Sequence, residues 1–193
     1  MSDFQFNEEK HEYTLGGIVI PGVTQVIQDA GLINFDGVNK ELLDYKADIG
    51  RKVHSATELY DSGILDEESL HPILKGYFDS WVKFRKDFKF EPVKIEAQLF
   101  HPIYRFAGRI DRIGMIDKDE TLVEIKSGGK QKVHEIQTAG YSLLWCQDKK
   151  KIKRRIAVYL SEEGYKIEEH KNPSDKNIFI ACLSIYNYKK GLK

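Results

Sequence analysis

Cysteine is scarce in this sequence, and its scarcity excludes several kinds of site. The 193 residues include only two cysteines, Cys146 and Cys182, and these do not form a CxxC pair. A disulfide framework, a cysteine-based zinc site and a four-cysteine iron–sulfur cluster all need more thiols than that. We therefore expect a protein with no such cluster, in the reducing environment of the cytoplasm.

Long hydrophobic runs and an excess of one charge are also missing. No apolar run approaches the roughly 20 residues that span a bilayer, so no membrane partner is expected. The N-terminal segment lacks the basic and apolar regions of a secretory signal. Thirty basic residues balance 30 acidic ones, which argues against a protein that coats nucleic acid through bulk charge. An enzyme whose basic residues gather around one cleft is still compatible with this balance.

The rest of the composition is that of an ordinary globular domain. Hydrophobic residues make up 41% and charged residues 31% of the chain. A length of 193 residues favours one hydrophobic core. We expect a single domain over residues 1–193, with its core at about 50–170, an N-terminal hairpin and helices within 1–49, and a C-terminal helix at 174–190.

Hydrophobic periodicity changes along the chain and predicts the order of the elements. Alternating segments joined at Gly16-Gly17 predict a hairpin, helical spacing follows, and after Pro92 the period changes to two. The expected elements are a hairpin at 12–20, helices at 24–30, 36–61 and 66–88, strands at 93–100, 104–116 and 121–127, a helix at 133–147, a hairpin of strands 155–160 and 165–169 turning at 163–164, and a last helix from 174 to 189. Gly50 is a point at which the 36–61 helix could divide. This order predicts an α/β or α+β domain with a mixed central sheet covered by helices.

Three charged residues lie in the otherwise apolar strands at the middle of the chain. Asp111 stands among isoleucines, and Glu124 and Lys126 flank Ile125. Charged residues are seldom placed at buried strand positions unless they are paired or bind a metal. Two carboxylates and a backbone carbonyl on converging strands suit Mg²⁺ or Mn²⁺, and a nearby lysine can position an attacking water. The alternative, from these residues alone, is a structural ion network on a half-exposed sheet.

The register of the hairpin between these strands decides whether the three charges converge. With a turn at Lys118-Asp119, counting back along both strands pairs Asp111 with Lys126. Cross-strand partners share a face of the sheet, so Glu124, two residues before Lys126, would point the same way. A loop one residue longer or shorter would put Asp111 on the opposite face.

At this point the sequence resembles a known superfamily. Asp111, followed on the next strand by Glu124-Ile125-Lys126, resembles the signature of the PD-(D/E)XK nucleases. Further matches resemble the branch that contains the RecB and AddB nuclease domains, Cas4 and MGME1, some of them viral; these are Gly50-Arg51-Lys52-Val53-His54, Gly108-Arg109-Ile110-Asp111, Gln137-Thr138-Ala139-Gly140-Tyr141 and the opening Pro21-Gly22-Val23-Thr24. The proline that often precedes the metal-binding aspartate is replaced by Ile110. The cluster cysteines of Cas4 and AddB are missing, so the resemblance is closer to cluster-free members.

The resemblance implies a fold and an activity. The fold would be restriction-endonuclease-like, an α/β domain with a mixed central β-sheet flanked by α-helices. The activity would be that of a deoxyribonuclease dependent on Mg²⁺ or Mn²⁺, acting as an exonuclease on single-stranded DNA or DNA ends. Such an enzyme would serve recombination, repair or replication, and a helicase or recombination protein could be its partner.

The resemblance also assigns residues to roles. The implied catalytic residues are Asp111, Glu124, Lys126, Gln137 and Tyr141, and the implied metal ligands are His54, Asp111, Glu124 and the backbone carbonyl of Ile125. Glu58, one turn after His54, and Glu96, on the preceding strand, are candidates to support the ligands from behind. DNA contacts are expected from Arg109, Arg112, Ser127, Lys130 and Lys132.

Each assignment has an ordinary alternative. His54 could be a capping or surface residue, Glu96 the exposed face of a strand, and Gln137 with Tyr141 plain helix surface. For the whole protein, one alternative is a catalytically silent nucleic-acid-binding or assembly module with the same fold. Another is a sugar- or nucleotide-processing enzyme whose acidic pair serves as general acid and base.

Overall fold

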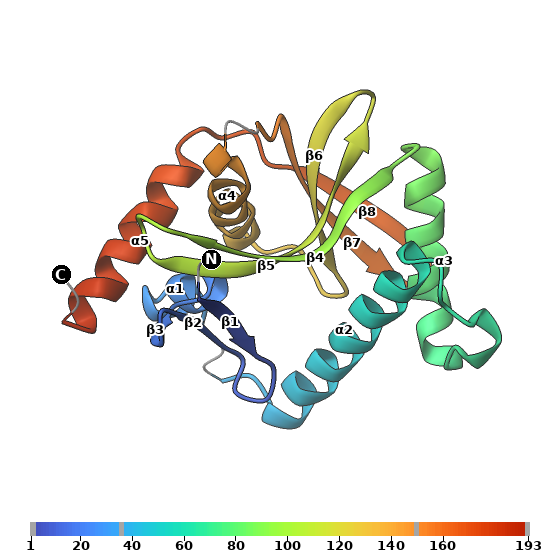
Figure 1. The fold of residues 1–193 in the computed structure, drawn as a ribbon. Coiled ribbons are helices and arrows are strands. Elements are labelled where there is room, and N and C mark those ends of the chain that lie inside the picture. Colours follow the sequence, from blue (N-terminus) through green and yellow to red (C-terminus); the bar gives the residue numbers. More distant parts are fainter. Residues whose placement is uncertain (1–2, 35–36, 149–150, 192–193) are drawn as a thin grey trace.

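The computed structural model describes residues 3–34, 37–148 and 151–191 (Figure 1). Its strands are β1 (Phe4–Asn7), β2 (Glu12–Leu15), β3 (Ile18–Ile20), β4 (Glu91–His101), β5 (Phe106–Ile116), β6 (Asp119–Lys126), β7 (Arg154–Ser161) and β8 (Gly164–Glu169). Its helices are α1 (Val23–Asp29), α2 (Lys40–Asp61), α3 (Pro72–Asp87), α4 (Val133–Trp145) and α5 (Asp175–Lys189), with 3₁₀ turns η1 (Glu67–Ser69) and η2 (Cys146–Asp148).

The central sheet has five strands in the order β4-β5-β6-β7-β8. All neighbours are antiparallel except β6 and β7, which are parallel. A parallel pair needs a crossover connection, and α4 lies in that connection. The structure thus confirms the predicted mixed α/β sheet flanked by helices, as in the restriction-endonuclease-like fold.

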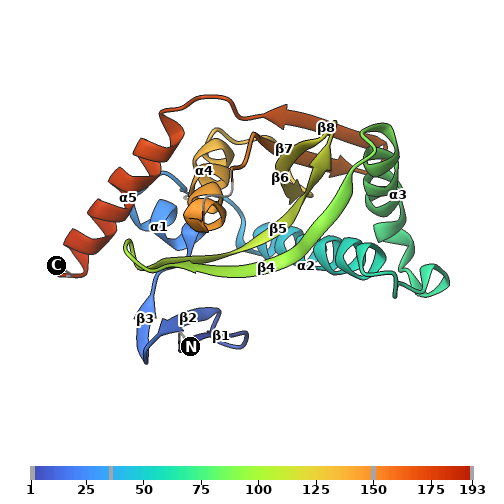
Figure 2. The same cartoon turned by 45° about the horizontal axis from the view of Figure 1, so that its top comes forward.

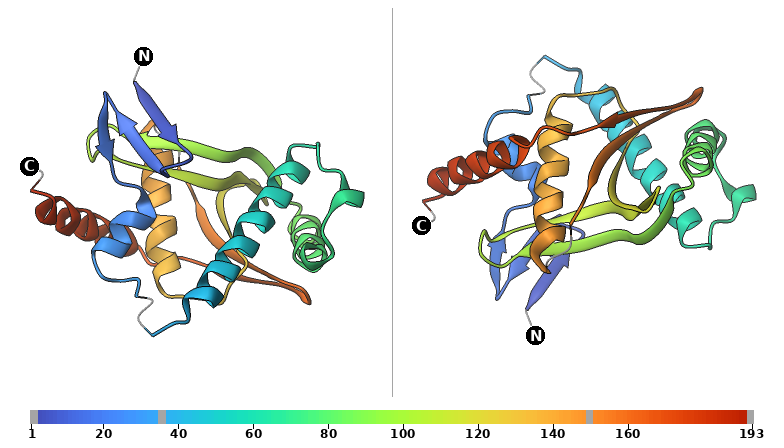
Figure 3. Two further views of the ribbon diagram at one scale, coloured as in Figure 1. Left: turned by 90° about the horizontal axis from the view of Figure 1, so that it is seen from below. Right: turned by 90° about the horizontal axis from the view of Figure 1, so that it is seen from above.

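Helices cover both faces of this sheet (Figures 1 and 3). Helices α1, α4 and α5 share one hydrophobic core with residues of β5 and β6, including Leu122. Helices α2 and α3 share a second core with β6 and β7, which includes Val123 and Ile125. Leu122 points toward the core under α4, and side chains alternate along a strand. Glu124 and Lys126, two and four residues later, therefore lie on the same face, toward α4.

The N-terminal residues form a separate three-stranded sheet, β1-β2-β3, which Figure 2 shows on one side of the central sheet. Tyr13 and Ile20 pack there against Ala107 of β5 and against Phe100 of β4. The sequence predicted the β2–β3 hairpin but missed β1, although its residues Phe4–Asn7 alternate between apolar and polar side chains.

The helix ends differ from expectation in two places. Helix α2 runs unbroken through Gly50, with Asn39 as its N-cap; the predicted start at Asp36 falls outside the described residues. Helix α3 begins at Pro72 rather than at Asp66, because proline favours the first helical position, where its missing N–H costs nothing. None of the helices in the described ranges has the length and hydropathy to cross a membrane.

Both predicted turns of the central sheet are displaced. The β5–β6 turn is Asp117-Lys118, both in the left-handed region with φ of 50° and 70°, and not Lys118-Asp119. The pair Arg112–Val123 then puts Asp111 opposite Glu124 instead of Lys126. The register error is two residues, so every side chain keeps its predicted face. In the β7–β8 hairpin, Ser161 pairs with Gly164, so the turn begins one residue earlier than predicted.

Candidate active site

Asp111 and Glu124 meet where strands β5 and β6 separate. The β5–β6 ladder ends at Arg112 and Val123, and beyond it Asp111 Oδ2 accepts a hydrogen bond of 2.7 Å from the backbone N–H of Ile125. Both carboxylates are buried, with Asp111 6% and Glu124 2% exposed. A side-chain carboxylate thus takes the place of a strand carbonyl and draws the two acids together.

Helix α2 brings His54 to this pair. Val53, Ala56 and Thr57 are buried and fix the helix against the domain. His54 Nδ1 then lies 3.4 Å from Asp111 Oδ1. Glu58 was expected to orient the His54 ring, but its side chain forms no hydrogen bond or ion pair within the described part of the chain.

Glu96 lies closer to His54 and Asp111 than expected. Its neighbours Ile95 and Ala97 pair with Arg112 and Ile110, which places Glu96 opposite Asp111. His54, Glu96 and Asp111 each offer a ligand atom within 4.8 Å of the others. Glu96 has a φ of 47°, a conformation that costs a non-glycine residue about 1–3 kcal/mol and that clusters at functional sites.

Arg112 is the anchor behind Glu96, and the expectation that it contacts DNA is wrong. Its side chain is fully buried, and its guanidinium donates to Asp61 Oδ2 at 2.6 Å, to Glu96 Oε1 at 2.8 Å and to the Asp111 carbonyl at 2.6 Å. Asp61 also accepts from Trp81 and Arg85. The arginine therefore holds the backbone of Asp111 and the side chain of Glu96 from the side of α2 and α3. We call Glu96, Asp111 and Glu124 the acidic group.

Lys126 is held between a strand and helix α4. Its Nζ donates to Glu124 Oε1 and to Gln137 Oε1, both at 2.9 Å. Gln137 Nε2 in turn donates to the Tyr141 hydroxyl at 3.2 Å. A Cβ added to Gly108 would lie 2.8 Å from the Tyr141 ring, so this glycine is what lets the Tyr141 ring sit against β5.

The pKa values of Asp111, Glu96 and Glu124 differ widely. Burial alone would raise the pKa of Asp111, but the charges of His54 and Lys126 and two hydrogen bonds outweigh it and lower that pKa to about 2. Burial and the charge of Asp111 raise the pKa values of Glu96 and Glu124 to about 7. The charge of Asp111 also raises the pKa of His54, against the effect of burial. Burial is the larger of the two causes for Glu96 and Glu124, since it disfavours the charged form of a carboxyl group.

The remaining residues expected to bind DNA lie at the edge of the site. Arg109 Nε is 3.0 Å from Glu96 Oε2, so it belongs partly to the acidic group. Gly128, Gly129, Lys130 and Lys132 are exposed in the loop that follows Lys126, with Ser127 at its partly buried start.

The residues present fit a hard divalent cation. Glu124 Oε2 is buried with no hydrogen-bond partner among the described residues, and carboxylates together with one imidazole are groups that bind divalent cations. The two cysteines form no cluster-like arrangement, because Cys146 lies in η2 and Cys182 is buried in α5.

Sequence reasoning missed three residues of this site. Asp61 and Thr57 hold Arg112, and Thr24 accepts from Gln137 Nε2 at 3.4 Å. Asp61 ends a helix and has the pattern of a solvated residue, so no local signal marks it. Thr57 follows His54 by three residues, and its hydroxyl bonds the His54 carbonyl; a buried threonine beside a ligand is the one clue that was available.

Comparisons with known proteins identify the family of this chain. A protein-family model described as PD-(D/E)XK nuclease superfamily matches residues 65–179, which is more than half of the chain. None of the curated proteins matches. Among solved structures, one titled "Crystal structure of SSO0001" is 16% identical, with a TM-score of 0.39 over 75% of this chain and 73% of that one. A likeness at that level supports no inference about function.

Proposed function

This chain belongs to the PD-(D/E)XK nuclease superfamily, and we propose that it is a metal-dependent DNA exonuclease acting on single strands or DNA ends. Family membership supports phosphodiester hydrolysis with a divalent metal. The preference for Mg²⁺ or Mn²⁺, the exonuclease action and a role in recombination, repair or replication in the cytoplasm are parts of the proposal. So is delivery of the DNA by a helicase or recombination partner.

One observation carries the proposal. Buried Glu124 offers one oxygen to Lys126 and leaves the other without a hydrogen bond among the described residues. A buried carboxylate oxygen without a partner is costly. A cation held by Glu124 together with Asp111, His54 and Glu96 would remove that cost. The carbonyl of Ile125 is a further proposed ligand.

The chain's own groups then have separate tasks in hydrolysis. A bound divalent cation would supply positive charge at the phosphate and lower the pKa of a water molecule. Lys126, fixed by Glu124 and Gln137, is placed to orient the attacking water or a phosphate oxygen through its N–H groups. The water oxygen bonds to phosphorus and gives up a proton to the solvent, the bond to the leaving oxygen breaks, and that oxygen takes a proton from the solvent. Tyr141 keeps Gln137, and through it Lys126, in position.

The substitution Lys126→Ala tests the role of the lysine. We expect about 10²- to 10³-fold lower kcat for DNA cleavage in Mn²⁺, the usual cost of one charge-stabilising donor. Thermal stabilisation by Mn²⁺ should persist, because the proposed ligands remain. Lys83→Ala, on the exposed surface of α3, is the matched control and should cleave normally. Full activity in Lys126→Ala would refute the assigned role.

Linear and circular single-stranded DNA, each with Mn²⁺ or EDTA, test the class of enzyme. An exonuclease digests the linear strand, spares the circle and stops in EDTA. Digestion of both would make the enzyme an endonuclease. No cleavage of any DNA in Mn²⁺ would support the catalytically silent module instead, and activity that survives EDTA would support a metal-free acid–base enzyme.

A further inference from the structure

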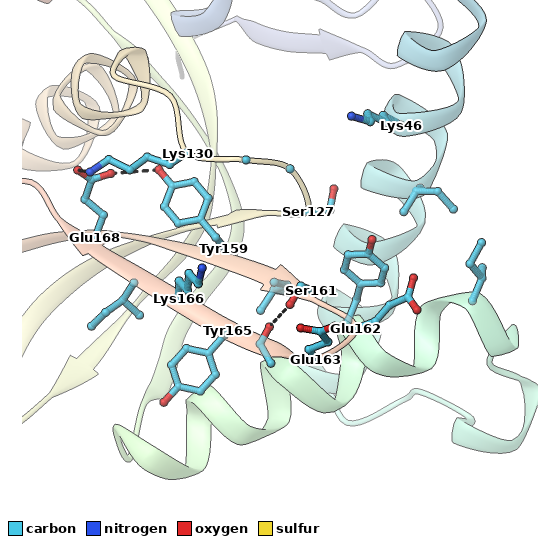
Figure 4. Close-up of a pocket in the computed structure, with 18 of the residues that line it drawn as sticks. Lys46, Ser127, Lys130, Tyr159, Ser161, Glu162, Glu163, Tyr165, Lys166 and Glu168 are labelled. Atoms are coloured by element: carbon cyan, nitrogen blue, oxygen red, sulfur yellow. Dashed lines mark hydrogen bonds and ion pairs between the residues drawn. The ribbon is translucent and has the colours of Figure 1, made fainter.

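A cleft adjoins the acidic group on the side of the β6–α4 loop. It encloses about 950 Å³ between α2, α3, the 127–130 loop and the β7–β8 hairpin (Figure 4). Ser127, which lines it, follows Lys126 directly. A Cβ on Gly50 of α2 would lie 3.3 Å from Ser127 Oγ, so the loop meets the helix there. The cleft therefore begins next to the site around Lys126, at the point where the loop meets α2.

One stripe of α2 leads from the acidic group into the cleft. Lys46, Gly50 and His54 are spaced four residues apart and so share a side of the helix. Lys46 lines the cleft and His54 contacts Asp111. At 1.5 Å per residue the stripe from Lys46 to His54 covers about 12 Å. That is three to four nucleotides at a stacked spacing of about 3.4 Å.

The unpaired charges of the cleft are separated by sign. Lys46 and Lys166 form no ion pair with any described residue. Glu168 is already paired with Lys130. The other lining acids are Glu162 and Glu163 in the hairpin turn, which Figure 4 shows beside α3, away from Lys130. Two unpaired lysines, on α2 and β8, therefore equal the two unpaired glutamates in number. The glutamates lie together in the hairpin turn, so a phosphate would be attracted to the lysines away from that turn.

The loop between β6 and α4 offers backbone donors. Gly128 and Gly129 are exposed, and their amides donate no hydrogen bond to any described residue. Without side chains, these two residues allow a phosphate oxygen to come close to the N–H groups.

Tyr45 is the ring best placed to stack on a base. It is 54% exposed on α2 where it lines the cleft. The hydroxyls of Tyr159 and Tyr165 are engaged with His134 and Asp87, and Tyr77 is partly buried in the core. An exposed ring beside a free lysine is the combination that binds single strands without sequence preference.

We infer that this cleft holds an unpaired stretch of the DNA strand adjoining the scissile phosphate, with a base on Tyr45 and phosphates at Lys46 and the Gly128-Gly129 amides. The inference rests on the proposed nuclease function. A volume of about 950 Å³ is in the upper range of ligand pockets; it suits a few nucleotides but not a turn of duplex. The cleft thus selects single strands over duplex.

The test measures binding of fluorescein-labelled oligothymidylate, and of a duplex of equal length, by anisotropy in EDTA. Tyr45→Ala should weaken single-strand binding about fivefold or more, since stacking contributes about 1–3 kcal/mol per base. Lys46→Ala should reduce the slope of log K against log salt by about 0.7. Duplex binding should stay unchanged in both.

Matched controls come from the same chain. Tyr188→Ala removes a ring that is 86% exposed on α5, and Lys52→Ala removes an α2 lysine that is paired with Asp48 outside the cleft. Both should bind oligothymidylate as the wild type does. Bis(4-nitrophenyl) phosphate, too small to reach the cleft, measures hydrolysis by the wild type without the cleft, and Tyr188→Ala and Lys52→Ala should cleave it as the wild type does in Mn²⁺.

The outcomes separate this inference from the function on which it rests. If the wild type cleaves DNA but Tyr45→Ala and Lys46→Ala bind single strands normally, the cleft assignment is overturned and the nuclease function stands. Equal losses for duplex and single strand would overturn the selectivity. If the wild type cleaves neither DNA nor the small ester in Mn²⁺, the proposed function fails and the cleft assignment fails with it.

Discussion

The buried carboxylate of Asp61 gives the sharpest test of how the acidic group is supported. It accepts from Arg112 at 2.6 Å, Arg85 at 2.7 Å and Trp81 at 3.1 Å. The side chains of Asp61 and Arg112 are both fully buried. Asp61→Asn keeps the size of the side chain, removes its charge and leaves Arg112 with Glu96 as its one carboxylate partner among the described residues.

The expected loss of stability is large. Removing one partner of a buried ion pair costs about 3–5 kcal/mol, because the other charge is left buried and uncompensated. Glu96 still faces Arg112 at 2.8 Å, so we expect the lower end, about 3 kcal/mol. For a domain of this size, each kcal/mol lowers Tm by about 2–4 °C, which gives a fall of about 6–12 °C.

Urea unfolding of the metal-free protein, followed by circular dichroism, measures the loss. Asp48→Asn is the matched control, since Asp48 lies on the same helix but its side chain is 41% exposed and pairs with Arg51 and Lys52 on the surface. Surface pairs contribute about 0–1 kcal/mol. If the two variants lost the same free energy of unfolding, Asp61 would not be a buried anchor and the account of Arg112 would be wrong.

Two further predictions concern the same region. Gly108→Ala should cost about 1–3 kcal/mol of stability in urea unfolding by displacing the Tyr141 ring, and it should lower DNA cleavage. The control is Gly129→Ala, whose added Cβ has nothing within 4 Å. Its free energy of unfolding should be close to that of the wild type. The pKa values of Glu96 and Glu124 are raised from 4.5 to about 7, so the folded protein holds protons that the unfolded chain has released, and metal-free stability should fall as pH rises through that window. Glu124→Gln should flatten that fall, and Mn²⁺ should raise Tm more above pH 7 than below it, because the metal needs deprotonated ligands. Stability that rose across this window would refute the raised pKa values.

The sequence predicted the central sheet well because its signals are local and repeated. Alternation marked each strand from 93 to 169, and a register error of two residues did not matter, since the side-chain period is also two. Asp111, Glu124 and Lys126 therefore share a face as expected, although the turn lies one residue earlier. The start of α3 could have been predicted as well, from the proline at its first position.

Arg112 shows where local reasoning fails. Alternation puts it on the face opposite Asp111, and that face is buried under α2 and α3, where an arginine needs partners. Its main partner, Asp61, is 51 residues earlier in the chain. The packing of α2 against β5 and the left-handed φ of Glu96 produce no pattern in the neighbouring residues of the sequence. Arg112 beside Asp111 was therefore interpreted as a surface residue that contacts DNA.

The two contacts of α2 with β5 together explain why the acidic group is open to a cation. His54 of helix α2 contacts Asp111 of β5, and Asp61 of the same helix contacts Arg112, the residue that follows Asp111. His54 and Asp61 are two helical turns apart. The Asp61–Arg112 contact is short, at 2.6 Å, and fully buried, while the His54–Asp111 contact is 3.4 Å long. The helix is thus fixed by the residue that has no ligand role. Under the proposed function, His54 can turn toward the metal without loosening the helix, because Asp61 and the buried residues of α2 keep it in place.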